Sequence, residues 1–266
     1  MDLELTGKVA IVSGGSRGIG KAVARVLAQE GADVAIVARD MAVAGAVAKE
    51  LAHDSGRKVE AFKSDTGKDD AVRDAVAAIA AAFGRVDILV NSAANPASQA
   101  RAPKLAEVTD DPFFAEMNTK VLGYLRMARE AAPYMKREGW GRIINISGLN
   151  ARMTGNIIGS IRNVGVAALT KNLADELGSD GICVTCVHPG FTRTEKTFAM
   201  VERLAGAAGI TLEEQERRLA SRVVIGRMPT AEEVANVVAF LASPKSVAIT
   251  GDSIAAGGGT PGSIYY

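Results

Sequence analysis

The chain of 266 residues contains only two cysteines and two histidines, and it has no long hydrophobic run. Its apolar stretches fall short of the ~18 residues that a membrane-spanning helix requires. The N-terminus is acidic and has no apolar core of the kind found in signal peptides. Basic and acidic residues nearly balance, 31 against 30, so neither a nucleic acid nor a membrane surface is expected as a partner. These absences favour a cytoplasmic protein whose partner is a small-molecule substrate.

The two cysteines, Cys183 and Cys186, have a spacing that also occurs in redox and metal sites. They lie in a β-branched run over 182–187 that predicts a strand, and residues three apart on a strand point to opposite faces. The only histidines, His53 and His188, are too few to complete a zinc site. We therefore predict two core thiols and no metal ligands.

Segments of strand and helix character alternate along the whole chain. Strands are predicted over 8–13, 34–38, 59–63, 88–91, 141–146, 182–187 and 253–256. Helices are predicted over 19–30, 41–53, 71–83, 113–136, 164–177 and 231–242, with a mostly helical insertion over 195–222. This alternation is typical of an α/β fold with a doubly wound, mostly parallel seven-stranded sheet and helices on both faces. No linker or repeat interrupts it, so we expect one domain over 1–266 with a helical lid at about 191–222.

A glycine-rich turn, Ser13-Gly-Gly-Ser-Arg-Gly-Ile-Gly20, joins the first predicted strand to the first helix. Glycines let the backbone approach a phosphate closely, and a helix N-terminus favours an anion through its free N–H groups and its dipole. The turn therefore predicts a pyrophosphate site, although a purely structural turn is the alternative, and its spacing differs from the broader dinucleotide fingerprint. The predicted contacts are Gly14, Ser16, Arg17, Gly18, Ile19 and Gly20.

This turn is the first of an ordered set of segments that resemble the motifs of the short-chain dehydrogenase/reductase family. Ser13 stands where the family has threonine, and it keeps the hydroxyl. The further matches are residues 91–94, 118–123, 189–194, 227–234 and 250–251. The resemblance covers essentially the whole chain and implies a Rossmann-type fold and a nicotinamide cofactor. It also implies a homo-oligomer, a tetramer or a dimer, packed through the helices predicted over 113–136 and 164–177.

The family's cofactor contacts carry over to matching positions of this chain. Asp65 and Thr66, just after the third predicted strand, resemble the family's adenine contact. Asn118 matches the helix asparagine that organises the active-site water in the family. The remaining contacts that the resemblance implies are Asn91, Ala93, Asn163, Pro189, Gly190, Thr192 and Thr194. With the glycine-rich turn, these residues make up the predicted cofactor site.

The end of the second predicted strand discriminates between the two nicotinamide cofactors. NAD-binding proteins of this kind place a carboxylate there for the ribose diol, whereas this chain has Ala38 followed by Arg39. Arg17, inside the glycine-rich turn, is expected near the same ribose, and two guanidiniums suit a 2′-phosphate. Two solvated surface arginines, with Asp40 neutralising Arg39, are the alternative. We predict NADP(H) in preference to NAD(H).

The family's Tyr-x-x-x-Lys catalytic pair is missing from this chain. In the family, the tyrosine passes a proton to or from the substrate oxygen, and the lysine lowers the pKa of the tyrosine and binds the nicotinamide ribose. The register of the downstream helix puts Gly159 at the tyrosine position and Asn163 at the lysine position. The serine position falls on Gly148, with Ser147 one residue earlier. The candidate catalytic residues are therefore Asn118, Ser147 and Asn163.

Other side chains could replace the missing pair. His188 has an intrinsic pKa that suits an acid. Arg162 could stabilise an oxyanion electrostatically, and Ser160 lies in the same altered segment. Tyr265 and Tyr266 end the chain, and the C-terminal tail of tetrameric family members can approach a neighbouring subunit's site. For each of these residues a purely structural role is the alternative.

The pattern of retained and missing motifs supports two main hypotheses about function. The first is an NADP(H)-dependent oxidoreductase with an atypical active site, acting on a carbonyl/hydroxyl or an activated C=C substrate. Reduction of a C=C bond fits better, because solvent can protonate the accepting carbon afterwards. The alternative is a non-catalytic cofactor-binding or regulatory protein, and a third class is reuse of the fold for hydrolysis or dehydration. Residues 92–104, 149–160 and 191–222 are expected to shape the substrate pocket.

Overall fold

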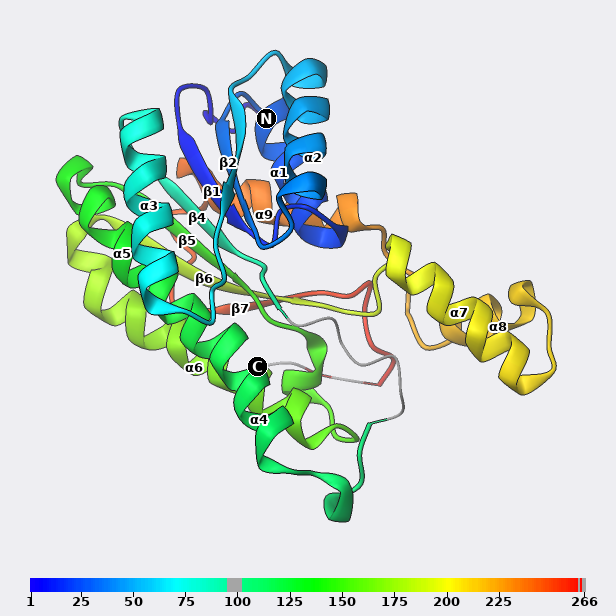
Figure 1. The fold of residues 1–266 in the computed structure, drawn as a ribbon. Helices are drawn as coiled ribbons and strands as arrows, with labels where there is room; N and C mark the ends of the chain where they lie inside the picture. Colours follow the sequence, from blue (N-terminus) through cyan, green and yellow to red (C-terminus); the bar gives the residue numbers. More distant parts are fainter. Residues whose placement is uncertain (95–101, 263, 265–266) are drawn as a thin grey trace.

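The computed structural model describes residues 1–94, 102–262 and 264. Within them, seven parallel strands form one sheet in the order β3-β2-β1-β4-β5-β6-β7 (Figure 1). The strands are β1 (Val9–Ser13), β2 (Asp33–Ala38), β3 (Val59–Lys63), β4 (Ile88–Asn91), β5 (Gly141–Ile146), β6 (Ile182–Pro189) and β7 (Ser253–Ala256). The winding direction reverses between β1 and β4, and this reversal leaves a crevice beyond the carboxyl ends of the two strands. The predicted Rossmann-type fold is confirmed.

Helices cover both faces of the sheet (Figure 1). One layer consists of α1 (Gly18–Gln29), α2 (Met41–Ser55) and α9 (Ala231–Ala242), and the other of α3 (Asp69–Phe83), α5 (Gly123–Glu138) and α6 (Ile157–Leu177). The apolar side chains of each layer form a core cluster with the sheet face beneath them. Because both faces are covered, β1, β4 and β5 are buried along their whole length. That burial explains why β1 and β4 read as nearly continuous apolar runs in the sequence.

The long helix predicted over 113–136 is interrupted. The structure has α4 (Asp110–Glu116), then a π-helical segment over Met117–Leu122, and then α5. A π-helix closes its hydrogen bonds over five residues rather than four, so it changes which side chains face the sheet. The prediction of one regular helix is corrected here, and the difference matters for the site because residues 118 and 120 lie in the π-helical segment.

Helix α6 begins earlier than the sequence pattern predicted, at Ile157 rather than at residue 164. Its N-cap is Asn156, whose side-chain oxygen accepts a hydrogen bond from the Gly159 N–H at 2.8 Å. This cap starts the helix one turn before the altered motif. Gly159 and Asn163 therefore lie inside a helix that is anchored at its beginning.

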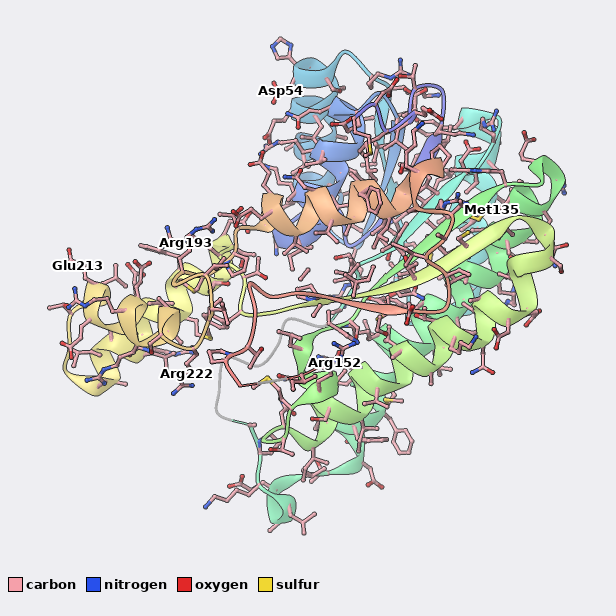
Figure 2. The ribbon with its side chains drawn as sticks, turned by 180° about the vertical axis from the view of Figure 1, so that it is seen from behind. Asp54, Met135, Arg152, Arg193, Glu213 and Arg222 are labelled. Atoms are coloured by element: carbon pink, nitrogen blue, oxygen red, sulfur yellow. The ribbon has the colours of Figure 1, made fainter. Side chains whose placement is uncertain are left out.

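The predicted helical insertion consists of α7 (Glu195–Ala208) and α8 (Leu212–Ala220), which pack against each other. Thr194 and Thr211 cap these helices through their side-chain oxygens. The pair reaches away from the body of the molecule (Figure 1), and Figure 2 shows it from behind with Glu213 at its outer end. In the part of the chain that the structure describes, no helix is long and apolar enough to cross a bilayer.

Candidate cofactor and active site

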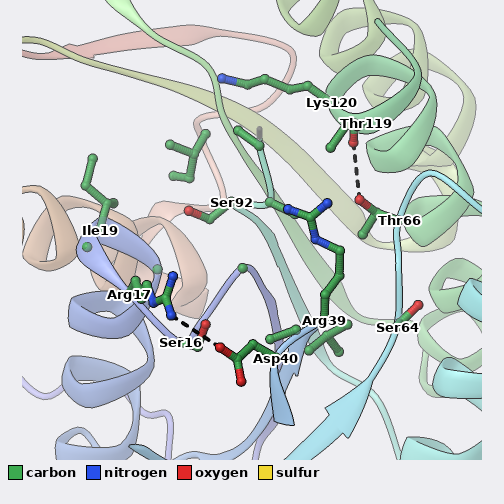
Figure 3. Close-up of a pocket in the computed structure, with 18 of the residues that line it drawn as sticks. Ser16, Arg17, Ile19, Arg39, Asp40, Ser64, Thr66, Ser92, Thr119 and Lys120 are labelled. Atoms are coloured by element: carbon green, nitrogen blue, oxygen red, sulfur yellow. Dashed lines mark hydrogen bonds and ion pairs between the residues drawn. The ribbon is translucent and has the colours of Figure 1, made fainter. Parts of the chain in front are cut away.

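A cavity of about 390 Å³ opens at the carboxyl ends of the strands where the sheet order reverses (Figure 3). The glycine-rich turn after β1 forms one wall, and the segments after β2, β3 and β4 form the others. The predicted cofactor residues that line this cavity are Gly14, Ser16, Arg17, Gly18, Ile19, Gly20, Arg39, Asp65, Thr66, Ala93 and Thr194. The structure thus brings residues from distant parts of the chain together around one cavity.

The glycines of the turn are required by close backbone contacts. Gly14 has a φ of 70°, and a Cβ there would lie 2.8 Å from the backbone of Ala93. A Cβ on Gly20 would lie 2.3 Å from the carbonyl oxygen of Gly14. These distances are far below van der Waals contact, so a side chain at either position would push the turn apart. The turn is therefore a narrow backbone cradle at the start of α1.

The cradle already holds an anionic group of the protein. The Gly18 N–H, at the N-terminus of α1, donates a hydrogen bond to Oε2 of Glu195 at 3.2 Å. A carboxylate at this position is a stand-in for a phosphate, because both are anions that free N–H groups and the helix dipole attract. The first turn of α1 carries no acidic residue of its own. The residues present therefore fit the pyrophosphate of a dinucleotide, provided that Glu195 moves aside.

Two arginines mark the other end of the cavity. Arg17 forms an ion pair with Asp40 at 3.3 Å, and Asp40 also caps α2 by accepting from the Val43 N–H. Asp40 therefore pairs with Arg17 rather than with Arg39, contrary to the alternative weighed from the sequence. Arg39 makes no ion pair or hydrogen bond with any residue that the structure describes, and its side chain extends across the cavity (Figure 3). Its guanidinium is free to meet an anionic group of a ligand.

Two of the predicted cofactor contacts, Asn91 and Thr192, do not line either cavity. Asn91 is buried at the end of β4, and its Nδ2 donates to Asn145 Oδ1 at 2.9 Å on the neighbouring strand β5. Thr192 donates its hydroxyl to the carbonyl oxygen of Gly190 at 3.0 Å. Neither side chain is among those that line the two cavities described here. Both residues hold the backbone around the site in place.

A second cavity of about 580 Å³ adjoins the first, because Ile19 and Ile146 line both. Its walls come from the ends of β5 and β6, from α6 and from the end of α8. Pro189 and Gly190 line it, together with parts of the predicted substrate-shaping regions 149–160 and 191–222. Of the third such region, 92–104, residues 95–101 lie outside the described residues.

Asn163, which the sequence register assigns to the lysine position, lies at this second cavity. Asn163 is 2% exposed and lines the cavity, and its backbone carbonyl accepts a hydrogen bond from the Ser147 hydroxyl at 3.0 Å. Gly148, which also lines it, leaves little room, because a Cβ there would lie 3.0 Å from Asn163 Nδ2. At Gly159 a Cβ would lie 2.8 Å from Cγ of Asn156. The capping side chain of Asn156 thus fills the space next to Gly159.

The structure places Asn118 away from the site. Its Nδ2 donates to the carbonyl oxygen of Gly67 at 3.1 Å, and its Oδ1 accepts from Arg126 at 2.9 Å. Asn118 lines neither cavity. Its interactions tie the π-helical segment to the loop after β3, which is a structural role.

Lys120, two residues further on, faces the site instead and was missed from the sequence. It is 5% exposed and lines the first cavity. Its Nζ donates to the carbonyl oxygen of Ser147 at 2.9 Å and to Oδ1 of Asn163 at 3.2 Å. Burial lowers the pKa of Lys120 to about 7, and the nearby positive charge of Arg162 acts in the same direction. The lysine thus brings a titratable ammonium to Ser147 and Asn163, two of the three residues that the sequence had singled out as catalytic.

The other proposed substitutes are engaged elsewhere. Burial lowers the pKa of His188 to about 4, with smaller contributions from Arg152 and Lys120, and its side chain lines neither cavity. Arg162 lines the second cavity but forms an ion pair with Glu116. At neutral pH, His188 is therefore unprotonated and cannot act as an acid.

The groups that remain are Ser160, three tyrosines and the two cysteines. The Ser160 hydroxyl donates to the carbonyl oxygen of Met153 at 2.9 Å, so it serves the local backbone. Tyr265 and Tyr266 lie outside the described residues. Tyr124 is fully buried, and its hydroxyl donates to the carbonyl oxygen of Ile146 at 3.0 Å. Cys183 and Cys186 are free thiols, and the described residues contain no cluster of three or more His, Cys, Asp or Glu side chains suited to a metal ion.

The chain is similar to known proteins along almost its whole length. Residues 14–260 match the family model described as enoyl-(acyl carrier protein) reductase. The chain is 34% identical over 254 residues to the short-chain reductase protein NovJ of Streptomyces niveus, covering 95% of this chain and 94% of that one. It is 31% identical over 272 positions to the 3-oxoacyl-[acyl-carrier-protein] reductase FabG of Aquifex aeolicus, covering 97% and 99%. The structure of L-sorbose reductase from Gluconobacter frateurii, complexed with NADPH and L-sorbose, superposes with a TM-score of 0.92 at 28% identity, covering 99% and 100%.

Proposed function

Because the chain belongs to the short-chain dehydrogenase/reductase family, we propose that it is an NADP(H)-dependent oxidoreductase with an atypical active site. Its substrate carries a carbonyl or hydroxyl group or an activated C=C bond. The observation that carries this proposal is the first cavity, in which an anion-binding glycine cradle and the unpaired guanidinium of Arg39 line the same space. The cofactor, when bound, supplies or accepts a hydride.

The choice of NADP(H) over NAD(H) rests on charge at the ribose end of the cavity. Arg39 has no partner among the described residues, so it keeps its full charge for a ligand. A guanidinium binds a phosphate through charge-assisted, often bidentate hydrogen bonds, and the ribose of NAD(H) offers no such anion. Structures similar to this chain include reductases described as NADPH complexes or as NADPH-dependent. These points together support NADP(H).

We place the substrate in the second cavity, which adjoins the cofactor cavity and is bounded at one side by the end of α8, a part of the predicted lid. Leu219 near the end of α8 and Arg222 just after this helix line the cavity. Arg222 forms no ion pair with any residue that the structure describes, so a keto acid belongs in the substrate screen beside other compounds. Similar proteins are named for the reduction of 3-oxoacyl thioesters and of L-sorbose, and both classes also belong in the screen.

We also propose a homo-oligomer that packs through α4–α6. Large apolar side chains are exposed along this part of the surface, which a partner copy would cover. They are Phe114, Leu122, Leu125, Ile157, Ile161 and Val164. Analytical ultracentrifugation tests this proposal, and a monomer at all concentrations would rule it out.

A non-catalytic cofactor-binding protein is the second candidate. Gly159 and Asn163 replace the family's two main catalytic side chains, and this observation favours a loss of chemistry. Such a protein would bind NADPH without turning anything over.

Two measurements on the purified protein decide between the candidates. Fluorescence titration with NADPH and NADH measures cofactor binding, and we expect clearly tighter binding of NADPH. Absorbance at the nicotinamide band then follows NADPH consumption with 3-oxoacyl thioesters, ketoses, keto acids and enoyl thioesters. Turnover of at least one class supports the oxidoreductase, whereas tight NADPH binding without any turnover supports the non-catalytic protein. Absence of binding contradicts both.

A further inference from the structure

The ammonium group of Lys120 lies where the two cavities meet. Lys120 lines the cofactor cavity, while its two hydrogen-bond acceptors, Ser147 and Asn163, line the adjoining cavity. Figure 3 shows Lys120 at the opposite end of the cofactor cavity from Arg17 and Asp40. A ligand that spans both cavities must therefore pass beside this side chain.

Burying an ammonium without a carboxylate partner is costly, and such lysines are rare in protein interiors. Within the described part of the chain, Lys120 forms no ion pair, and its two hydrogen-bond partners are neutral oxygens. An ammonium has three N–H donors, so these two bonds leave one for a ligand. A buried ammonium with one unused N–H can donate a proton to a ligand or stabilise a negative charge that develops on it.

The groups around Lys120 come from several elements, and they set its titration. Arg162 on α6 disfavours the ammonium, whereas Glu116 on α4 and Cys186 on β6 favour it. Burial is the largest effect, and it brings the pKa of Lys120 down to about 7. His188 on β6 is neutral at this pH. A lysine that titrates near neutrality can both hold and release a proton under ordinary conditions.

The location matches the work that the missing residues do in the family. Asn163 stands at the lysine position, and Ser147 directly precedes the serine position. Lys120 reaches this point from the opposite side, from the π-helical segment before α5 rather than from α6. Its four-carbon side chain thus brings a nitrogen to the place where the family's own lysine would begin.

We propose that Lys120 replaces the missing Tyr-x-x-x-Lys pair, donating a proton to the substrate oxygen and holding a positive charge beside the nicotinamide end of the cofactor. This inference rests on the proposed oxidoreductase function. In the reducing direction, a bound NADPH would supply the hydride that the carbonyl carbon accepts and would be left as NADP⁺. The π electron pair of the C=O bond moves to oxygen, and an N–H bond of Lys120 breaks as the O–H bond forms there. The neutral amine then takes up a proton from water.

Two variants separate the proton-donor role of Lys120 from its charge role, and a third variant is the control. Lys120→Met removes charge and proton but nearly keeps the shape, whereas Lys120→Arg keeps a charge that cannot be released as a proton in this pH range. Lys171→Met is the matched control, because Lys171 is an exposed lysine on α6 whose partner is Asp175. Each variant is compared with the wild type by NADPH titration, by kcat and kcat/KM against pH, and by thermal unfolding.

We expect Lys120→Met to lose about 100-fold or more in kcat and to bind NADPH several-fold more weakly. Lys120→Arg is expected to bind NADPH nearly as well as the wild type but to turn over as slowly as Lys120→Met. The wild-type kcat/KM for reduction falls as pH rises through about 7, since the ammonium is the acid, and this step is absent from Lys120→Met. Lys171→Met behaves like the wild type in every respect. Primary amines added to a Lys120→Ala variant restore part of the activity.

The outcomes also separate this inference from the proposed function. If the wild type reduces a substrate and Lys120→Met keeps its kcat and pH profile, Lys120 is not the acid, although the oxidoreductase stands. If the wild type reduces nothing, the oxidoreductase and the proton-donor role both fail. NADPH binding to the wild type still tests whether Lys120 holds a positive charge beside the cofactor. Binding must then weaken as pH rises through about 7, because Lys120 loses its charge there. That test needs no variant, so it remains available if Lys120→Met fails to fold. NADPH binding that does not depend on pH would overturn the charge role.

Discussion

Arg39 offers a quantitative test of how this chain selects its cofactor. Its guanidinium has no partner in the described part of the chain, so replacing it breaks no ion pair of the free protein. The whole effect of Arg39→Ala therefore falls on ligand binding. A hydrogen bond to a charged group contributes about 1.5–3 kcal/mol, which corresponds to a factor of roughly 10 to 150 in a dissociation constant.

We expect Arg39→Ala to weaken NADPH binding by that factor and to leave NADH binding almost unchanged, because only NADPH carries the 2′-phosphate. Arg73→Ala is the control, since Arg73 is an exposed arginine on α3 whose partner is Asp69. Fluorescence titration of the wild type and both variants with each cofactor gives the dissociation constants. The loss for NADPH should shrink as salt is added, because an exposed guanidinium is screened. An equal loss for both cofactors, or no loss for either, would show that Arg39 does not read the 2′-phosphate.

Three further predictions concern other groups. Glu195→Gln removes the carboxylate that accepts from the N-terminus of α1, and it should tighten NADPH binding about 2- to 5-fold. Glu202→Gln, on the same helix α7, is the control and should leave NADPH binding unchanged. Equal effects of the two variants would refute competition between the Glu195 carboxylate and the cofactor phosphate. Asp87→Asn weakens the hydrogen bonds that a fully buried carboxylate accepts from Arg85 and from the β1 backbone. It should cost roughly 2–3 kcal/mol in denaturant unfolding, less than for a fully buried pair because the arginine is partly exposed, and an unchanged midpoint would contradict this. His188 has a folded-state pKa lowered to about 4, so the free energy of unfolding should fall by roughly 3 kcal/mol as pH falls from about 6.5 toward 4. His188→Gln should lose less stability over the same pH range. Parallel curves of unfolding free energy against pH for the two proteins would exclude His188 as the cause.

The fold could be predicted from the sequence because its local signals agree. The apolar strands β3, β4, β5 and β7 have the predicted ends, and the alternation of strands and helices left only a parallel sheet covered on both faces. The glycine-rich turn was placed correctly because a turn between a strand and a helix of such a sheet lies at its carboxyl edge. These are properties of neighbouring residues, which a sequence displays directly.

Lys120 could not be found in this way, because the helix around it is not regular. In an α-helix each residue turns by about 100°, so residues 118 and 120 are roughly 200° apart and face opposite sides. Placing Asn118 toward the site therefore placed Lys120 away from it. The π-helical segment over Met117–Leu122 breaks this regularity, and the hydrogen bonds of Asn118 to Gly67 and Arg126 turn the asparagine outward. A lysine among apolar residues at 121, 122 and 124 was the one available signal.

Two other features depend on contacts between distant parts of the chain. The Glu195 carboxylate meets Gly18 across a long separation in sequence, and nothing local marks it as a competitor for the anion site. The early start of α6 did have a local signal, because Asn156 is a preferred N-cap residue three positions before Gly159. Gly159 argued against a helix start at this point, because glycine disfavours a helix interior.

The most direct measurement is the transfer of a label from cofactor to product. The wild-type protein is incubated with NADPH that carries deuterium at both hydrogen positions of the nicotinamide C4, together with the 3-oxoacyl thioester, ketose, keto acid and enoyl thioester panel. The products are then analysed by mass spectrometry. A reductase transfers the deuterium to a carbon of at least one product, and this transfer should become at least about 100-fold slower in Lys120→Met. Bound cofactor that keeps all its deuterium with every compound would contradict the proposed oxidoreductase and leave a protein that only binds NADPH.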